Sequence, residues 1–360
     1  MRKCPGRRAW AKNPGNTMTH PPIPQTLTQA LDPTWLSHAL TPLTGGAAVT
    51  AVETVEVIRT VATKVRFTVA YEGGTAALCL KGFLDVDEQM ARGGAVNVLE
   101  ADFYDKLAPH LPLRRPERVA TVINREAPGA VVIMRDLIAG GAKFCSALDP
   151  FSADEAAASL GLLAQLHAGS FLLASSPWIK PRLSDFVRNA YVPLPLLQEM
   201  LHGKRGEGLP DRTKDAALLL QALAVLAERD AAGPQYLIHG DSHAGNIYRT
   251  AEGPGLIDWQ LLQQGGWALD VAYHITAVLP VDVAEREERA LLAHYRADMQ
   301  RLGADVPGEE EAWAQYRAAL VYGYYLWSIT RRVDPAITNL FVNRLGNAVT
   351  HHNSFALLGV

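Results

Sequence analysis

The chain of 360 residues contains few cysteines, and these lie far apart. Only Cys4, Cys79 and Cys145 occur, an odd number with no short spacing between any two of them. Disulfide frameworks and cysteine-based zinc modules both require more cysteines at closer intervals. The composition therefore favours a protein of the reducing cytoplasm without structural disulfides.

The sequence also lacks long apolar runs and an excess of charge of either sign. No uninterrupted stretch of 18 apolar residues occurs, so we expect no membrane-spanning helix and no membrane partner. The 34 Lys and Arg residues and 37 Asp and Glu residues give a formal net charge of −3, which provides no basic surface for nucleic acid. Nothing in the composition indicates an oligomeric state.

The N-terminus is basic, but no apolar segment follows it. Residues 1–17, MRKCPGRRAWAKNPGNT, are therefore not typical of a secretory signal. We expect residues 1–27 to form a disordered tail.

The remainder changes in pattern near residue 136. Residues 47–83 alternate apolar and polar side chains around a turn at Gly73–Gly74, and 120–126 and 129–137 have the character of two further strands. A short helix is predicted over 28–40 and another over 93–111. We therefore expect an α+β fold in which residues 28–135 form a small lobe with an antiparallel sheet.

Residues 136–360 are predicted to form a larger, mainly helical lobe. Ser152 and Glu155 form a capping box at the start of an Ala- and Leu-rich helix. Further helices are predicted from the apolar periodicity. They cover residues 211–230, 268–278, 284–301 and 309–331.

Polar residues gather in one short span, YLIHGDSHAGNIYRTAEGPGLIDW, at residues 236–259. The apolar segments on either side of TAEGPG predict an antiparallel hairpin. Asn246 precedes its first strand and Asp258 follows its second, so both side chains belong to the open end. An amide oxygen and a carboxylate brought together there suit Mg²⁺. Asp241, in the loop that enters the hairpin, can face the same site.

The spacing of His239, Asp241 and Asn246 is that of the catalytic loop of protein kinases. Gly240 stands where protein kinases have Arg, and IDW stands where they have DFG. With these differences, HGDSHAGNIY and GLIDWQ resemble the central motifs of the aminoglycoside phosphotransferase/choline kinase family. The DWQ sequence and the segment after it are most similar to the bacterial ecdysteroid-kinase-like branch of that family.

The resemblance implies a bilobal protein-kinase-like fold and an ATP- and Mg²⁺-dependent kinase that phosphorylates a hydroxyl group of a small molecule. Asp241 would be the catalytic base, and His239 would order the catalytic loop. Asn246 and Asp258 would bind Mg²⁺. Asp270, in GGWALDVAYHI, would brace the loop.

Three residues of the first half extend the resemblance to the nucleotide site. Lys81 in ALCLKGF matches the strand lysine that contacts the phosphates, and Glu100 in LEADFYDKL matches the helix glutamate that pairs with it. Arg135 stands at the interlobe hinge, where the family usually has Glu, which leaves GTP open beside ATP. The segment VIRTVATKV contains no glycine, although the family covers the phosphates there.

The acceptor is predicted from aromatic residues of the C-terminal helices. Trp313, Tyr324 and Trp327, together with His243, are candidates for the acceptor pocket. An aromatic wall suits an apolar molecule with a hydroxyl group, or an amino alcohol held by cation–π contact. A macrolide or aminoglycoside ranks third.

Two other functions remain open at this point. His239, Asp241 and His243 could hold a transition metal in a hydrolase, although His274 and the pair His351–His352 form no recognisable second cluster of ligands. The chain could also be a kinase-like binding protein without catalytic activity.

Overall fold

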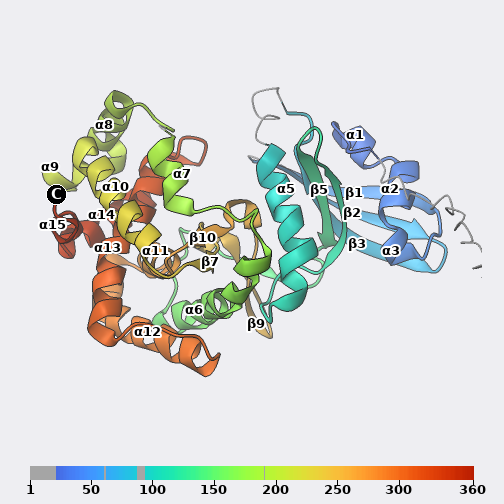
Figure 1. The fold of residues 1–360 in the computed structure, drawn as a ribbon. Helices are drawn as coiled ribbons and strands as arrows, with labels where there is room; N and C mark the ends of the chain where they lie inside the picture. Colours follow the sequence, from blue (N-terminus) through green and yellow to red (C-terminus); the bar gives the residue numbers. More distant parts are fainter. Residues whose placement is uncertain (1–21, 61, 87–93, 190) are drawn as a thin grey trace, which may run out of the picture.

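The computed structural model describes residues 22–60, 62–86, 94–189 and 191–360. Within these residues, a lobe built on an antiparallel sheet lies beside a larger helical lobe (Figure 1). The predicted α+β, bilobal fold class is confirmed. The exact division at residues 135 and 136 stays a prediction.

The predicted N-terminal tail lies outside the described residues from 1 to 21. The next residues are placed against the small lobe: Trp35 Nε1 donates to the carbonyl of Pro22 at 2.7 Å, and Ile23 and Leu27 pack against the sheet. The described small lobe therefore begins ahead of the predicted start at residue 28.

The small lobe contains a five-stranded antiparallel sheet with the strand order β1-β2-β3-β5-β4. In β2 and β3, Tyr71 pairs with Gly74 and Lys64 pairs with Lys81, so the predicted hairpin is present, with its turn at Glu72–Gly73, one residue before the predicted Gly73–Gly74. The strands are β1 (Val49–Arg59), β2 (Thr63–Tyr71), β3 (Gly74–Gly82), β4 (Arg118–Asn124) and β5 (Gly129–Arg135).

The two faces of the sheet are covered by different helices. Along β5, Val131 and Ile133 face the core shared with α1 (Leu27–Ala30) and α2 (Pro33–Ala39). The alternate residues Ala130, Val132 and Met134 face the large core that α5 (Gly94–Asp102) joins. This alternation follows the period of two of a β-strand. The N-lobe helix that carries Glu100 thus lies on the face turned toward the helical lobe (Figure 1).

The short helix predicted over 28–40 is divided in the structure. Asp32 accepts from the backbone N–H of Trp35 and caps α2, and Pro33 occupies its first turn. A proline at this position starts a helix but interrupts one that arrives from the N-terminal side. A third short helix, α3 (Thr41–Thr44), follows.

The helical lobe follows the predicted order. The helix predicted over 211–230 is interrupted by Asp215, whose carboxylate accepts from the backbone N–H groups of Ala217 and Leu218 and caps a new helix. The helices are α6 (Ala153–Ala168), α7 (Arg182–Arg188), α8 (Leu194–His202), α9 (Asp211–Lys214), α10 (Ala216–Ala232), α11 (Ala268–Val278), α12 (Val281–Arg301), α13 (Glu309–Ser328), α14 (Pro335–His351) and α15 (Ser354–Leu358).

Short strands between these helices carry the central motif. The predicted hairpin is confirmed: β8 (Ile247–Thr250) pairs with β9 (Gly253–Leu256). A second pair joins β7 (Tyr236–Ile238) to β10 (Gln263–Gly265), and β6 (Lys143–Phe144) extends the β8 side.

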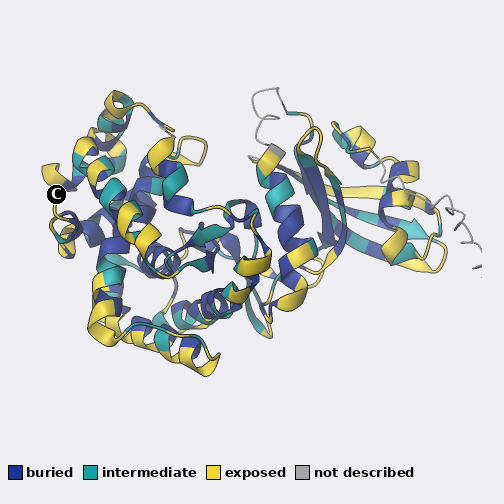
Figure 2. Ribbon diagram, viewed as in Figure 1, coloured by how far each residue is buried: buried dark blue, intermediate teal, exposed yellow. Residues whose placement is uncertain are grey.

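Buried residues run through the inside of the helical lobe, and exposed residues lie on its outer surface (Figure 2). Eight of the 16 residues of α6 are buried. Every residue of α11 is buried. Residues Ala153–Ser175 pass a test of length and composition for a membrane span, but 56% of the apolar window lies inside the lobe. This burial is typical of a core helix.

Candidate active site

The loop from His239 to Asn246 runs between β7 and β8 and adopts a backbone that only glycine fits at position 240. Gly240 has φ of +77°, and a Cβ atom there would lie 2.4 Å from the carbonyl oxygen of Leu261. Its own carbonyl accepts from the hydroxyl of Tyr322, which is fully buried. The glycine that replaces the kinase Arg is therefore required by the backbone.

The buried carboxylate of Asp270, on α11, binds the backbone of this loop. Its Oδ2 accepts from the backbone N–H of His239 at 2.6 Å, and its Oδ1 accepts from that of Gly240 at 2.9 Å. His167, at the end of α6, lies 3.2 Å from Oδ2. Burial raises the pKa of Asp270, but the interactions with His167 and with the Gly240 N–H together outweigh this effect. The net pKa of Asp270 is therefore lowered. The buried carboxylate is ionised and holds two backbone N–H groups of the loop; its role as the brace of a catalytic loop stays a prediction.

His239 uses both ring nitrogens within the loop. Nδ1 accepts from the backbone N–H of Asp241 at 3.2 Å, so the ring proton is on Nε2, which donates to the carbonyl of Ile257 at 2.9 Å. An imidazole engaged at both nitrogens has none left to move a proton. The geometry supports a role in ordering the loop.

Asp241 lies at the centre of a small hydrogen-bond network. Asn246 Nδ2 donates to the Asp241 carbonyl at 2.8 Å and to Oδ2 at 3.1 Å, and Tyr273 donates its hydroxyl proton to Oδ1 at 3.1 Å. His243 Nε2 lies 3.6 Å from Oδ2. Burial raises the pKa of Asp241, but the neighbouring His243 and His239 outweigh this effect. The net pKa of Asp241 is therefore below its usual range. The carboxylate is ionised and can accept a proton.

Asp258 projects from a left-handed backbone position, with φ of +66°. Aspartate is among the few residues other than glycine that adopt this conformation readily. Its Oδ1 lies 2.9 Å from Lys81 Nζ, and its Oδ2 lies 3.8 Å from Lys64 Nζ. Burial raises the pKa of Asp258, but the ammonium groups of Lys81 and Lys64 outweigh it, and the net pKa is strongly lowered.

The predicted pair of Lys81 and Glu100 is present, with 2.7 Å between Nζ and Oε2. Both side chains are almost fully buried. Burial lowers the pKa of Lys81, but Asp258 and Glu100 raise it more, so the ammonium remains charged. Lys81 thus links Glu100, on α5 of the small lobe, to Asp258, which follows the β8–β9 hairpin of the helical lobe.

Further contacts hold α5 against the segment after Asp258. Glu100 Oε1 accepts from the backbone N–H of Trp259 at 3.3 Å, and the Phe103 and Trp259 rings stack with centroids 3.8 Å apart. Gln260 Nε2 also donates to Asn97 Oδ1. These contacts place Glu100 and Lys81 relative to the hairpin.

A cavity of about 320 Å³ opens between the lobes beside these charges. Lys64, Lys81, Glu100 and Asp258 line its charged end. Arg135 lines it from the hinge, as predicted, and its backbone N–H donates to the carbonyl of Glu117. The apolar part is lined by Ile58, Met134, Leu137, Ile138 and Ile257. An apolar slot that leads to two lysines suits a nucleotide base and its phosphates.

The donor set beside this cavity fits a hard divalent cation. Because Asn246 directs its amide N–H groups to Asp241, its Oδ1 remains available, and Asp258 contributes carboxylate oxygens. Oxygen ligands of this kind are those that Mg²⁺ prefers. Asn246 and Asp258 would hold the ion, which would neutralise phosphate charge.

Aromatic residues form a wall beside Asp241, on the side where the acceptor was predicted. Among the predicted residues, His243 and Trp327 are brought together, with ring centroids 5.3 Å apart. Phe341 of α14 completes the wall: it stacks on Trp327 at 4.1 Å and meets the His243 ring edge-on. Trp327 Nε1 in turn donates to the Tyr273 hydroxyl that holds Asp241.

The other two predicted acceptor residues do not join this wall. Trp313 stacks on Tyr316 with centroids 5.3 Å apart, and the hydroxyl of Tyr324 donates to the carbonyl of Thr213. Trp313 precedes Trp327 by 14 residues, which is about 21 Å along a helix. Both side chains are buried in the core of the helical lobe, and so is Trp327, which therefore differs from them in its contact with His243 and not in its exposure.

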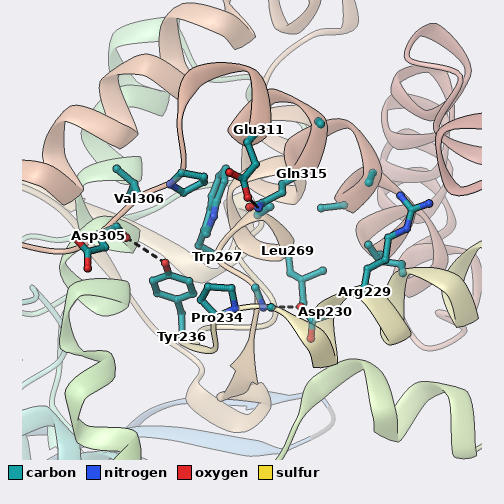
Figure 3. Close-up of a pocket in the computed structure, with 18 residues that line it drawn as sticks. Arg229, Asp230, Pro234, Tyr236, Trp267, Leu269, Asp305, Val306, Glu311 and Gln315 are labelled. Carbon is teal, nitrogen blue, oxygen red and sulfur yellow. Dashed lines mark hydrogen bonds between the residues drawn. The ribbon is translucent and has the colours of Figure 1, made fainter.

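A second cavity, of about 520 Å³, lies elsewhere in the helical lobe (Figure 3). Trp267 and Tyr236 form one side, Glu311 reaches over it from α13, and Asp230 accepts from the backbone N–H of Gly266 at its edge. Burial raises the pKa of Asp230 to about 6. Among the described residues, no predicted site residue lines this cavity, so it is separate from the cleft.

The geometry also bears on the hydrolase alternative. His239 uses both ring nitrogens inside the loop, so it cannot ligate a metal beside Asp241 without breaking the loop. Among the residues that the structure describes, the one group of at least three His, Cys, Asp or Glu ligands within metal-binding reach is Glu288, His351 and His352. The residues of the central motif form no such group.

Comparison with known proteins identifies the family. A model of the phosphotransferase enzyme family matches residues 95–304, more than half of the chain. The chain belongs to this family. The predicted resemblance to the aminoglycoside phosphotransferase/choline kinase family is thus confirmed, and so is the prediction of a small-molecule kinase at the level of the family. The ecdysteroid-kinase-like branch stays a prediction. A search of curated proteins found no match.

Solved structures show the same fold at low sequence identity. An ethanolamine kinase from Plasmodium vivax has a TM-score of 0.51 and 14% identity, with coverage of 89% of this chain and 87% of the other. A candidate aminoglycoside phosphotransferase from Ralstonia eutropha has a TM-score of 0.56 and 13% identity, with coverage of 92% and 98%. These likenesses confirm the kinase-like fold of the phosphotransferase.

Several residues of the phosphotransferase site are not identified by the sequence motifs. Lys64, Tyr273 and Phe341 touch the site through contacts between distant segments. The position of Lys64 has only an approximate sequence signal: a hairpin centred on the predicted Gly73–Gly74 turn would pair residue 81 with residue 66, whereas the observed turn at Glu72–Gly73 pairs it with residue 64. Tyr273 and Phe341 have none, because their approach depends on how the helices pack.

Proposed function

We propose that the protein is an ATP- and Mg²⁺-dependent kinase that transfers the γ-phosphoryl group to a hydroxyl of a small molecule. The observation that carries this proposal is the arrangement of Lys81, Glu100 and Asp258 at the end of the cleft, next to the ionised Asp241. Lys81 would contact the phosphates, and Glu100 would hold Lys81.

In the proposed reaction, the acceptor oxygen forms a bond to the γ-phosphorus while the bond from that phosphorus to the β–γ bridging oxygen breaks. ADP leaves, and the hydroxyl proton passes to the Asp241 carboxylate. Mg²⁺, when bound by Asn246 and Asp258, supplies charge neutralisation. Because phosphoryl transfer has a loose transition state, positioning and electrostatics contribute most of the catalysis.

The proposed acceptor is a molecule with an apolar body and a hydroxyl group, and an amino alcohol is the second candidate. Support comes from the wall of His243, Trp327 and Phe341 beside Asp241, in which the partly exposed His243 ring packs on the buried rings of Trp327 and Phe341. Aromatic rings hold apolar bodies by burial and cationic amines by cation–π contact. In this proposal residues 28–135 bind the nucleotide, and residues 136–360 hold the acceptor and the catalytic loop.

We propose the cytoplasm as the location, since ATP is available there. The thiols of Cys79 and Cys145 are free, which is compatible with a reducing compartment. GTP stays an alternative to ATP because Arg135 lines the cleft at the hinge.

Thermal unfolding with ATP or GTP, with and without Mg²⁺, tests the proposal. A ligand at 100 times its Kd stabilises the fold by about 2.7 kcal/mol, which is visible as a higher melting temperature. We expect Mg²⁺–nucleotide to stabilise the wild type but not Asp258→Asn, which keeps the left-handed backbone. Asp230→Asn, a buried carboxylate outside the cleft, is the matched control. If no nucleotide raises the melting temperature, the kinase proposal fails and an inactive kinase-like protein is favoured.

A further inference from the structure

A cluster of ligating side chains lies where α12 meets the end of α14. Glu288 belongs to α12, while His351 is the last residue of α14 and His352 is its C-cap. Each offers one ligand atom, and these atoms lie within 4.8 Å of one another. None of the three lines the interlobe cavity or the cavity of Figure 3. The cluster is therefore independent of both.

The core of the cluster is a buried carboxylate–imidazole pair. His352 Nε2 lies 2.9 Å from Glu288 Oε2, and only 6% and 5% of these two side chains are exposed. The Tyr316 hydroxyl donates to the same oxygen at 3.1 Å. Because this oxygen only accepts, His352 Nε2 carries a proton that a metal ion would replace. The tyrosine would orient the ligating carboxylate, as hydrogen bonds around metal sites commonly do.

The third ligand is mobile enough to complete a site. His351 has 47% of its side chain exposed, and its Nδ1 lies 3.4 Å from Glu285 Oε1. Zinc bonds of about 2.0–2.2 Å place tetrahedral ligand atoms roughly 3.4 Å apart. Zinc binding therefore requires the ligand atoms, now within 4.8 Å of one another, to close to that spacing, and the exposed His351 side chain is the one of the three with room to move.

The types of ligand atom in the cluster favour zinc over magnesium and calcium. Two imidazole nitrogens and one carboxylate oxygen suit Zn²⁺, whereas Mg²⁺ and Ca²⁺ prefer oxygen ligands alone. The nearby cations Arg289 and Arg317 lie over the ring of Trp313, at 4.2 and 5.7 Å from its centroid. Glu285 and Glu288 supply the negative charge that faces the two histidines.

We propose that Glu288, His351 and His352 form a zinc site that joins α12 to the end of α14. Three protein ligands leave one position for water. The same helix α14 carries Phe341, which packs on Trp327 and His243 at the acceptor side. Bound zinc would therefore stabilise the helix that supports the aromatic wall. This proposal does not depend on the proposed kinase activity.

The test is a zinc titration of the full, untagged chain after removal of metal, with a chromophoric chelator as competitor. Excess Mg²⁺ is present throughout to occupy the cleft. We expect one Zn²⁺ per chain, a higher melting temperature with zinc, and tighter binding at pH 7.5 than at pH 6, because zinc displaces a proton. His351→Ala should weaken binding at least tenfold, and so should Glu288→Gln.

The chain offers a closely matched control in His294. It lies on α12 with 47% of its side chain exposed, and its Nε2 is 3.5 Å from Asp298 Oδ2, so it has a carboxylate partner but belongs to no three-ligand group among the described residues. His294→Ala should bind zinc as the wild type does. Because His351 is exposed, its variant should fold even if Glu288→Gln does not, which circular dichroism checks. Unchanged binding in His351→Ala, no binding by the wild type, or loss only in Asp258→Asn would each overturn the proposal.

Discussion

The hydroxyl of Tyr273 donates a hydrogen bond of 3.1 Å to Asp241 Oδ1, and the indole N–H of Trp327 donates a hydrogen bond to the tyrosine oxygen. Burial raises the pKa of Tyr273 well above its ordinary value, and the charge of Asp241 raises it further. The phenol therefore stays protonated and fixes one carboxylate oxygen. Tyr273 is therefore a positioning residue for Asp241, the proposed catalytic base.

We expect Tyr273→Phe to lower kcat about tenfold and to leave nucleotide binding unchanged. A hydrogen bond to a carboxylate lowers its pKa, so the variant should raise the pKa of Asp241. The acidic limb of the kcat/KM profile should then move to higher pH. Tyr324→Phe is the matched control, because Tyr324 is buried and donates to the carbonyl of Thr213 away from the site. A pH profile that does not move would contradict the assigned role.

Asp241→Asn removes the proton acceptor but keeps the shape of the side chain. We expect kcat to fall by about 10²–10⁴, the usual contribution of a general base, while Mg²⁺–nucleotide affinity stays close to that of the wild type. Rapid-quench measurement of a single turnover is the readout. The control Asp230→Asn changes a buried carboxylate outside the cleft and should keep full activity. Single-turnover transfer at the wild-type rate in Asp241→Asn would rule out Asp241 as the base.

Lys64 places a second ammonium beside the cleft, in register with Lys81 and 3.8 Å from Asp258. The connection between β1 and β2 has no glycine, so backbone N–H groups at a tight phosphate-binding turn are not expected there. We expect Lys64→Met to raise the KM for nucleotide about tenfold with a smaller effect on kcat. Lys64→Arg should keep most of the affinity. Equal nucleotide KM values in wild type and Lys64→Met would show that the second charge does not contact phosphate.

His274 makes stability depend on pH. Burial lowers its pKa to about 4, with Nδ1 2.7 Å from the carbonyl of Ser242 and Nε2 2.8 Å from Ser159 Oγ. Since the unfolded chain binds this proton near pH 6.5, the contribution is present above that pH and is lost as pH falls toward 4. The loss amounts to about 3 kcal/mol. Urea unfolding at pH 4 to 7 measures it, and His274→Gln should show a shallower dependence. An unchanged slope in that variant would assign the acid sensitivity to other groups.

The parts of the fold and site that could be predicted from the sequence are those with local signals. The hairpin that carries Asn246 and Asp258 follows from turn residues between apolar segments, and its pairing is as expected. Lys81 and Glu100 were located by motif resemblance, and their ion pair is present. The pairing of Lys64 with Lys81 depends on the exact turn: the observed Glu72–Gly73 turn places residue 64 opposite residue 81, whereas the predicted Gly73–Gly74 turn would place residue 66 there.

The acceptor side could not be predicted in the same way, because helical periodicity shows which residues share a face but not what that face contacts. Tyr324 and Trp327 are three residues apart on α13, yet one reaches Thr213 and the other reaches Tyr273. Phe341 comes from a different helix and meets Trp327 only after both helices pack. Such contacts depend on tertiary packing.

The attachment of α5 to Trp259 has a consequence for control of the enzyme. In protein kinases, the position of the helix that carries the lysine-binding glutamate is a point of regulation. Here, outward movement of that helix would separate the stacked rings of Phe103 and Trp259 and remove the partner of a buried backbone N–H. We therefore expect this protein to lack an inactive state in which α5 moves outward. We also expect it to resist inhibitors that bind between α5 and the sheet. Its output would then follow the supply of acceptor and the amount of enzyme made.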